Sequence, residues 1–174
     1  MVQALAGPLP DGPVLDLASG PSGSALLAAA AGRRVTAVDV SDAALCLLAE
    51  EASRRGVLNF VSLVQADLGV WRPQPGSYAA GLCTGYWDRD LFPAAADAVT
   101  AGGVLGWEAF TAGARSVRPN IPGAWLLGAG EPASLLPATF ETLSQHELPD
   151  DRAGAKRQLL ARRVLGAGSQ ITGR

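Results

Sequence analysis

Residues 14–23, VLDLASGPSG, decide how the rest of the chain is interpreted. Residues 14–18 form a short apolar run of strand length, and the run contains one carboxylate, Asp16. Small residues and a proline follow at once, which is typical of a tight turn. A charge that is buried without a partner costs several kcal/mol. Asp16 therefore needs a partner close to this turn.

Strand-like and helix-like segments alternate along the chain after this stretch. Runs rich in β-branched residues predict strands, and the alanine- and leucine-rich segments between them predict helices. The last two strands come without a helix long enough for a crossover, so we expect them to pair antiparallel. The expected strands are 14–18, 34–40, 59–65, 78–83, 104–110, 140–148 and 157–164, and the expected helices are 22–31, 42–55, 88–100 and a short one at 131–137.

This alternation predicts an α/β fold with a doubly wound, seven-stranded, mostly parallel sheet and one antiparallel edge strand. Ligands of such sheets bind outside the carboxyl ends of the strands. The length of 174 residues predicts one domain, expected over residues 13–165. Proline and glycine predict an irregular leader over residues 1–12, and we expect a flexible tail over 166–174.

Composition excludes several classes of function. A net charge of −2 without a run of lysine or arginine argues against a nucleic-acid partner. The sequence shows neither a signal-peptide pattern nor an apolar run long enough to span a membrane. The two cysteines match no metal-binding spacing. We therefore expect a cytoplasmic protein without a metal, either a monomer or a homodimer, that acts on a small molecule.

Three aspartates stand at or near the ends of the first three expected strands: Asp16, Asp39 and Asp67. Parallel strands end at the same edge of a sheet, so these carboxylates should converge on one rim. Each could instead cap the helix after it, but only Asp67 is well placed for that. Ser41 is a better cap than Asp39, and Asp16 lies too early. The pattern favours one shared ligand.

These residues resemble the cofactor site of class I S-adenosylmethionine-dependent methyltransferases. The segments VLDLASGPSG, VTAVDVS and VQADL carry that resemblance. Within the superfamily, LASGPSGSALLAAAAGRRVTAVDVSDAAL and RDLFPAAADAV are similar to small bacterial tellurite-resistance-type methyltransferases. The resemblance covers nearly all of residues 14–165. It implies a Rossmann-like methyltransferase fold with S-adenosylmethionine as the cofactor.

The resemblance also implies roles for the three aspartates. Asp16 would face the amino group of the cofactor, Asp39 would accept hydrogen bonds from both ribose hydroxyls, and Asp67 would accept one from the adenine amino group. Small residues after the first strand would let the backbone approach the methionine and ribose parts closely. The expected cofactor-binding residues are Asp16, Ala18, Ser19, Gly20, Asp39, Val40, Ala66, Asp67, Leu68 and Cys83.

Two features depart from the family's pattern. Ser22 occupies a position that is usually glycine, and the glycine falls instead at Gly23. No substantial helix is expected before the first strand, although in many relatives that segment covers the cofactor. Both departures bear on how tightly the cofactor binds, and the second predicts an unusually open site.

The segment LCTGYWDRD ends the expected fourth strand at the rim where methyl transfer would occur. Tyr86 and Trp87 could line the pocket around a sulfonium cation, or Trp87 could instead fill the core. Asp88 and Arg89 could orient a substrate, or Asp88 could cap the next helix. The Gly- and Pro-rich segment 111–132 is expected to fold over the pocket as a lid. The candidate substrate-site residues are Tyr86, Trp87, Asp88, Arg89, Phe110 and Arg118.

The sequence thus predicts methyl transfer to a small-molecule acceptor, either a small anion or a thiol or chalcogen nucleophile, with no catalytic residue identified. An NAD(P)-binding oxidoreductase is one alternative, but its G-x-G-x-x-G fingerprint is absent, since only Gly20 and Gly23 lie in the turn. A non-catalytic S-adenosylmethionine-binding module is the other. Ser22, the short N-terminal segment and the lack of an obvious general base are all compatible with it.

Overall fold

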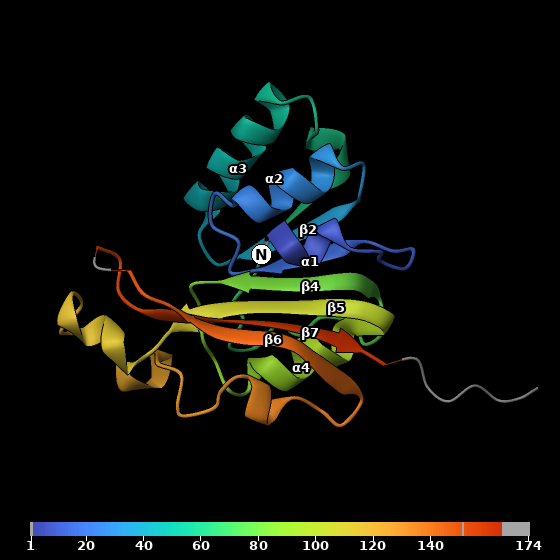
Figure 1. Cartoon of the computed structure of the whole chain (residues 1–174). Coiled ribbons are helices and arrows are strands. Elements are labelled where there is room, and N and C mark those ends of the chain that lie inside the picture. The colour runs from blue at the N-terminus through green and yellow to red at the C-terminus, as the bar shows by residue number, and fades with distance from the viewer. Residues whose placement is uncertain (1, 151, 165–174) are drawn as a thin grey trace, which may run out of the picture.

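Seven strands form one sheet in the order β3-β2-β1-β4-β5-β7-β6 in the computed structural model, which describes residues 2–150 and 152–164 (Figure 1). Neighbouring strands are parallel except that β7 runs antiparallel to both β5 and β6. The α/β fold class is confirmed, and the reversed strand lies one strand in from the β6 edge. The strands are β1 Val14–Leu17, β2 Val35–Asp39, β3 Val61–Gln65, β4 Tyr78–Thr84, β5 Val99–Phe110, β6 Phe140–Leu148 and β7 Lys156–Arg163.

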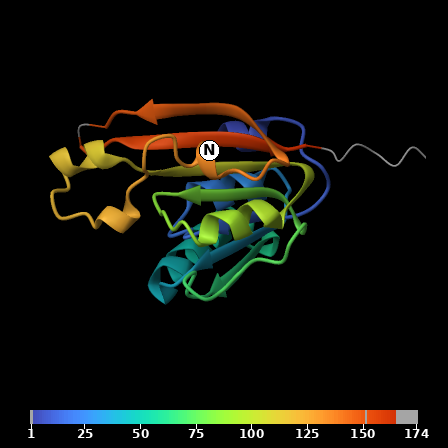
Figure 2. The ribbon, with the colours of Figure 1, turned by 90° about the horizontal axis from the view of Figure 1, so that it is seen from below.

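Helices cover both faces of the sheet, which Figure 2 shows from below. One buried cluster joins the sheet to α1, α2 and α3, and a second cluster on the opposite face joins it to α4. Because helices pack on both sides, the central strands β1, β4 and β5 are mostly apolar and buried. The helices are α1 Val2–Ala6, α2 Gly23–Ala30, α3 Asp42–Arg54 and α4 Leu91–Ala98.

The two faces decide where Asp16 points. Val14 belongs to the cluster under α1, α2 and α3, whereas Leu15 and Leu17 belong to the cluster under α4. Successive side chains on a strand point to opposite faces. Asp16 therefore shares the face of Val14 and lies on the side of the sheet where α2 begins.

The prediction of an irregular leader over residues 1–12 is wrong for residues 2–6, whereas residues 7–12 contain no helix or strand. Residues Val2–Ala6 form α1, which contacts α2 and β5. Ala4 is buried in the same cluster as Val14. The prolines that follow limit the helix to little more than one turn, and packing on the sheet stabilises it there. The tail predicted for 166–174 lies outside the described residues.

The expected helix at 88–100 is shorter than predicted. Strand β5 begins at Val99 rather than at 104, so α4 ends at Ala98. Val99 already pairs with Tyr78 of β4, and the register shifts before Ala80 pairs with Val104. The strand thus continues through the two glycines that were expected to separate it from the helix.

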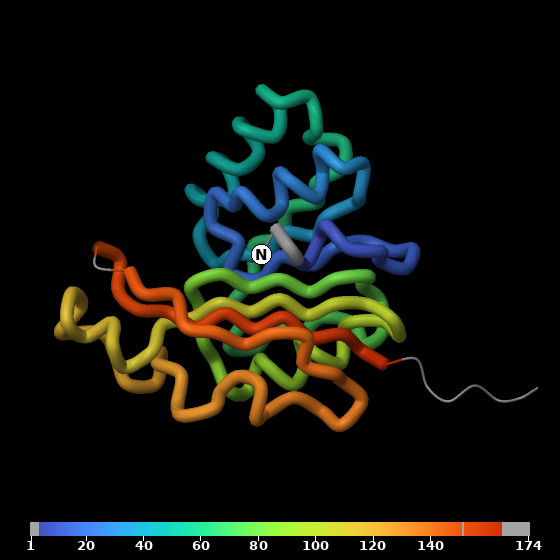
Figure 3. The backbone as a smooth tube through the Cα atoms, viewed as in Figure 1, coloured from blue at the N-terminus to red at the C-terminus, as the bar shows by residue number. Residues whose placement is uncertain are grey.

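The connection from β5 to β6 contains three short 3-10 helices over the segment 111–139, which the structure describes throughout. These are η2 Ala112–Ser116, η3 Gly123–Trp125 and η4 Ala133–Leu135. The helix expected at 131–137 is thus a single 3-10 turn. In Figure 3 the first part of this segment, drawn in yellow, extends past the carboxyl end of β5. It stands at the edge where ligands of such sheets bind.

Candidate functional site

The turn after β1 is built around a hydrogen bond between Ser22 and Asp16. Asp16 is 1% exposed, and Ser22 Oγ donates to its Oδ2 at 2.6 Å. Ser22 Oγ also accepts hydrogen bonds from the backbone N–H groups of Ser24 and Ala25, at 3.0 and 3.3 Å, and so caps α2. A glycine in place of Ser22 would lack both interactions. The departure from the family's pattern therefore has a structural role in joining β1 to α2.

Burial raises the pKa of the Asp16 carboxyl from 3.8 to about 7, although the hydrogen bond from Ser22 lowers it. The nearby Asp39 carboxylate raises this pKa slightly further. The partner that we expected for the buried Asp16 thus comes from the chain itself. It is the hydroxyl of Ser22.

An Asp16→Asn variant should change how stability depends on pH. The folded chain binds more protons than the unfolded chain between pH 3.8 and about 7, because the pKa of Asp16 is raised on folding. The free energy of unfolding of the wild type, relative to the variant, should therefore fall as the pH rises through this window. Urea unfolding at several pH values measures this difference in free energy. Asp11→Asn, at an exposed position, is the control. If the free energy of unfolding of the wild type fell by the same amount relative to Asp11→Asn, the assignment to Asp16 would be contradicted.

Asp39 ends β2 and orients two turns. Its Oδ2 accepts the backbone N–H of Gly20 at 2.7 Å, and its Oδ1 accepts the N–H of Ser41 at 2.8 Å. The N–H of Ser19 donates to the carbonyl of Val38, which holds the first turn against β2. Ser41 caps α3, as predicted. Asp39 is thus free to serve a ligand with its remaining lone pairs.

Asp67 follows β3 and is exposed. A turn over residues 68–70 comes next, and Asp67 Oδ1 accepts the N–H of Gly69 at 2.8 Å. The N–H of Ala66 donates to the carbonyl of Asp39, so the ends of β2 and β3 are joined. The carboxylate that could have capped a helix instead closes this turn.

These strand ends surround a cavity of about 390 Å³, the smaller cavity. Most of the residues predicted to bind a cofactor line it. Four of them do not: Asp16 and Cys83 are buried beneath it, and Ser19 and Gly20 belong to the turn after β1 but are not part of the lining. Burial raises the pKa of the Cys83 thiol, so this cysteine stays protonated. The lining residues are Ala18, Asp39, Val40, Ala66, Asp67, Leu68, Thr84, Gly85 and Tyr86.

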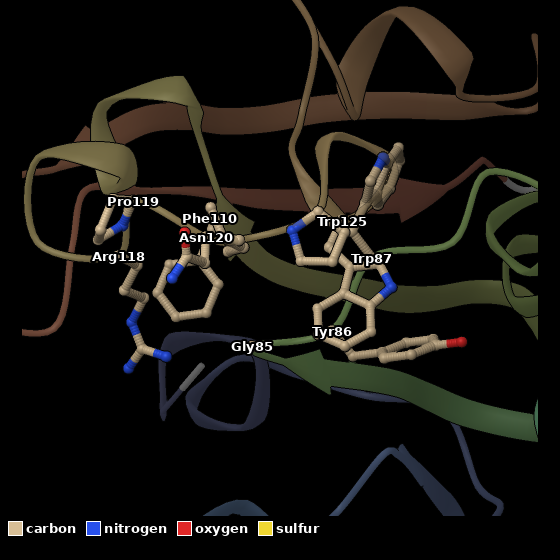
Figure 4. A pocket seen from close by; sticks show the side chains of 10 residues that line it. Gly85, Tyr86, Trp87, Phe110, Arg118, Pro119, Asn120 and Trp125 are labelled. Carbon is tan, nitrogen blue, oxygen red and sulfur yellow. The ribbon is translucent and has the colours of Figure 1, made fainter.

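A second cavity of about 550 Å³, the larger cavity, adjoins the first and shares Gly85 and Tyr86 with it. Figure 4 shows the side chains that surround it, with Phe110, Arg118 and Asn120 to one side and Trp87 and Trp125 to the other. The expected lid segment thus forms much of its wall. The lining residues are Gly85, Tyr86, Trp87, Phe110, residues 118–122 and Trp125.

The shared wall is held from behind by Trp107. Its Nε1–H donates to the carbonyl of Tyr86 at 3.0 Å. Trp87 packs against Phe92 and Trp107, with ring centroids 5.5 and 6.0 Å apart. Trp87 therefore fills the core and lines the larger cavity at once. Burial raises the pKa of Tyr86, so its hydroxyl stays neutral near pH 7.

Asp88 and Arg89 have structural partners and line neither cavity in the described part of the chain. Asp88 Oδ1 accepts the N–H groups of Asp90 and Leu91, at 2.8 and 3.1 Å, and so supports the start of α4. The guanidinium of Arg89 donates twice to Glu131, at 2.9 and 2.8 Å. This bidentate pair ties the end of the lid segment to the turn after β4.

Two residues that line the smaller cavity, Thr84 and Gly85, were not predicted. Gly85 has a φ of +86°, a conformation that only glycine adopts readily, and its N–H donates to the carbonyl of Glu108 at 2.7 Å. The glycine in LCTGYW, placed between a strand and an aromatic pair, was the available signal. It marks the turn at which the two cavities meet.

Two kinds of feature are absent from the described residues. None of their side chains form a cluster of three or more histidine, cysteine, aspartate or glutamate residues able to hold a metal ion. Within the same residues, no helix has both the length and the apolar character needed to span a membrane.

Residues 14–103 match the sequence model of a family described as "Methyltransferase domain". No curated protein matches the sequence. The fold is similar to that of an S-adenosylmethionine-dependent methyltransferase from Mesorhizobium loti (TM-score 0.71, 15% identity, covering 93% of this chain and 95% of that chain).

Two further solved structures are similar. One is geranyl diphosphate C-methyltransferase from Streptomyces coelicolor A3(2), in complex with Mg²⁺, geranyl-S-thiolodiphosphate and S-adenosyl-L-homocysteine (TM-score 0.70, 17% identity, covering 94% of this chain and 73% of that chain). The other is the [4+2]-cyclase SpnF (TM-score 0.68, 18% identity, covering 90% and 77%). At these identities the likeness concerns the fold alone.

Proposed function

The chain belongs to the methyltransferase-domain family, and from that premise we propose that it transfers a methyl group from S-adenosylmethionine to a small organic acceptor. The observation that carries the proposal is the pair of adjoining cavities at the carboxyl edge of the sheet. The smaller cavity contains two carboxylates, and the larger one is mainly aromatic and apolar. Gly85 and Tyr86 form the wall between them.

The smaller cavity has the groups that this cofactor needs. Asp39 would accept hydrogen bonds from the ribose hydroxyls, and Asp67 would accept one from the adenine amino group. Val40 and Leu68 supply apolar surface for the adenine ring. Apart from atoms of Gly20 and its two chain neighbours, no atom lies within 4 Å of the place where a Cβ on Gly20 would stand, so the turn is open to a ligand there.

The methionine end of the cofactor would meet the turn that Ser22 and Asp16 hold. The hydroxyl of Ser19 in this turn is buried and has no hydrogen-bond partner among the described residues. A buried hydroxyl without a partner is costly, and a polar ligand group would satisfy it. Asp16 would then act through Ser22, by orienting the turn.

When bound, the cofactor supplies an electrophilic methyl group. A lone pair of the acceptor forms the new bond to the methyl carbon, while the sulfur–methyl bond breaks and leaves its electron pair on sulfur. The contribution of the chain is to hold the two partners in line. Tyr86 suits that task because its backbone carbonyl is held by Trp107 and because the residue lines both cavities.

The finer predictions from the sequence remain proposals. Within the proposed class of acceptors, a cavity of about 550 Å³ with aromatic walls fits an organic thiol or an organic anion better than a bare inorganic ion. The resemblance to tellurite-resistance-type methyltransferases rests on sequence motifs alone. A cytoplasmic location and a monomeric or homodimeric state also stay predictions.

Calorimetric titration tests the proposal. We expect S-adenosylhomocysteine to bind in the micromolar range, at about −8 kcal/mol, and NAD to give no binding heat. Binding of NAD in its place would support the oxidoreductase alternative. A panel of small organic nucleophiles, with S-adenosylhomocysteine formation as the readout, then tests turnover. Binding without turnover of any member would favour a non-catalytic module.

A further inference from the structure

We propose that the larger cavity selects a flat, apolar acceptor that carries one anionic group, and that Arg118 binds this anion. The inference rests on the proposed function, because it takes the larger cavity as the acceptor site. It adds the chemical class of the acceptor and the residue that recognises it.

The walls of the larger cavity determine the body of the acceptor. Phe110 and Trp87 present their rings from different sides, and Trp125 stands at one end (Figure 4). Trp125 is 56% exposed, although a large aromatic side chain gains free energy when apolar surface covers it. A flat, apolar molecule would contact all three rings. The volume of about 550 Å³ lies within the range of small-molecule sites.

Arg118 is the only charged residue among those that line the larger cavity, all of which the structure describes. Its Nε donates to the carbonyl of Ala153 at 2.6 Å, and its guanidinium carbon lies 4.7 Å from the centre of the Phe110 ring. Both contacts fix the group at the rim beside Phe110. Its two terminal nitrogens have no acceptor among the described residues, so they are available to a carboxylate.

The other charged groups near Phe110 are engaged by other residues, so Arg118 is the group that would bind the anion. Lys156 also approaches the Phe110 ring, at 5.2 Å, but its ammonium is paired with Glu108 at 2.9 Å. Among the described residues, Asp150 is a nearby carboxylate, and its Oδ1 accepts two backbone N–H groups, those of Arg152 and Ala153. Arg118 therefore forms no ion pair with a described residue, and it lines the larger cavity.

The lining contains no carboxylate or imidazole in the described chain. Nothing there repels an anion, and nothing there removes a proton from the acceptor. The anionic group would be held at Arg118, while the reacting atom lies at the Gly85–Tyr86 end with its lone pair free. As the new bond to the methyl carbon forms, the sulfur–methyl bond breaks with its electrons left on sulfur. Any proton on the reacting atom leaves to water.

Paired probes of the same shape test the inference. Calorimetry would compare 2-naphthoate with its neutral isostere 2-naphthamide, on wild-type protein saturated with S-adenosylhomocysteine. We expect 2-naphthoate to bind about tenfold more tightly, with a preference that shrinks as salt is raised. Arg118→Gln should remove the preference and leave binding of 2-naphthamide unchanged. Arg118→Lys should keep part of it.

Arg115→Gln is the matched control, because Arg115 is an exposed arginine of the same segment that does not line the cavity. This variant should keep the full preference. Equal binding of both probes, failure of either to bind, or an unchanged preference in Arg118→Gln would each overturn the inference. None of these results would contradict the proposed function. The proposed function would instead fail if the wild-type protein did not bind S-adenosylhomocysteine.

Discussion

Asp39→Ala should weaken the binding of S-adenosylhomocysteine by about 1.5–3 kcal/mol, which is roughly tenfold to a hundredfold in affinity. The carboxylate is the group at the end of β2 that lines the smaller cavity. Its two hydrogen bonds, to the N–H groups of Gly20 and Ser41, fix the direction of its remaining lone pairs. The two hydroxyls of a ribose would each donate a charge-assisted hydrogen bond to it.

Two variants separate lost ligand contacts from a disturbed turn. Asp39→Asn keeps an oxygen acceptor for one backbone N–H but removes the charge, so it should lose most of the affinity as well. Asp42→Ala removes an exposed carboxylate at the first residue of α3, outside the cavity, and should bind as the wild type does. Calorimetry on folded protein measures all three. Unchanged affinity in Asp39→Ala would remove the ribose assignment.

The sequence was most informative where a local pattern has one structural meaning. Strand β6 begins and ends at the predicted residues, because β-strand signals and turn residues bound it clearly. Asp39 and Asp67 meet at one cavity because parallel strands end at the same edge. Helix α1 was missed because its five residues are too few to show helical periodicity.

The partner of Asp16 needed information that the pattern does not contain. Strand alternation places this carboxylate on the face of α2, but the path of the following turn decides what meets it. Ala18 adopts a φ of +47° and Gly20 one of +53°, which bring Ser22 back over the strand. A single sequence predicts a turn there, and its backbone angles come only from the structure.

The lid segment shows the same limit at long range. Its Gly- and Pro-rich composition predicted a functional connection, and the segment does line the larger cavity. The bonds that hold it, between Arg89 and Glu131 and between Arg118 and Ala153, join residues far apart in the chain. Arg89 and Arg118 looked alike as substrate-site candidates in the sequence. Of the two, only Arg118 lines the larger cavity, and Arg89 is paired with Glu131.

Trp107→Ala should lower the free energy of unfolding by about 3–5 kcal/mol, the range for truncation of a fully buried aromatic residue. Trp107 has no exposed surface, and its ring packs edge-on against both Trp87 and Phe92. Truncation would leave a cavity between β5 and α4 and would also remove the indole N–H that donates to the carbonyl of Tyr86. Urea unfolding monitored by circular dichroism measures the loss.

Trp125→Ala is the matched control, since it removes the same side chain from an exposed position at the larger cavity and should cost less than about 1 kcal/mol. Equal losses in the two variants would contradict the burial assigned to Trp107.

Trp107→Phe keeps most of the packing but removes the Nε1–H that fixes Tyr86. Because Tyr86 borders both cavities, this variant should weaken binding of S-adenosylhomocysteine and of 2-naphthoate together while the fold persists, whereas Trp125→Ala should weaken 2-naphthoate alone.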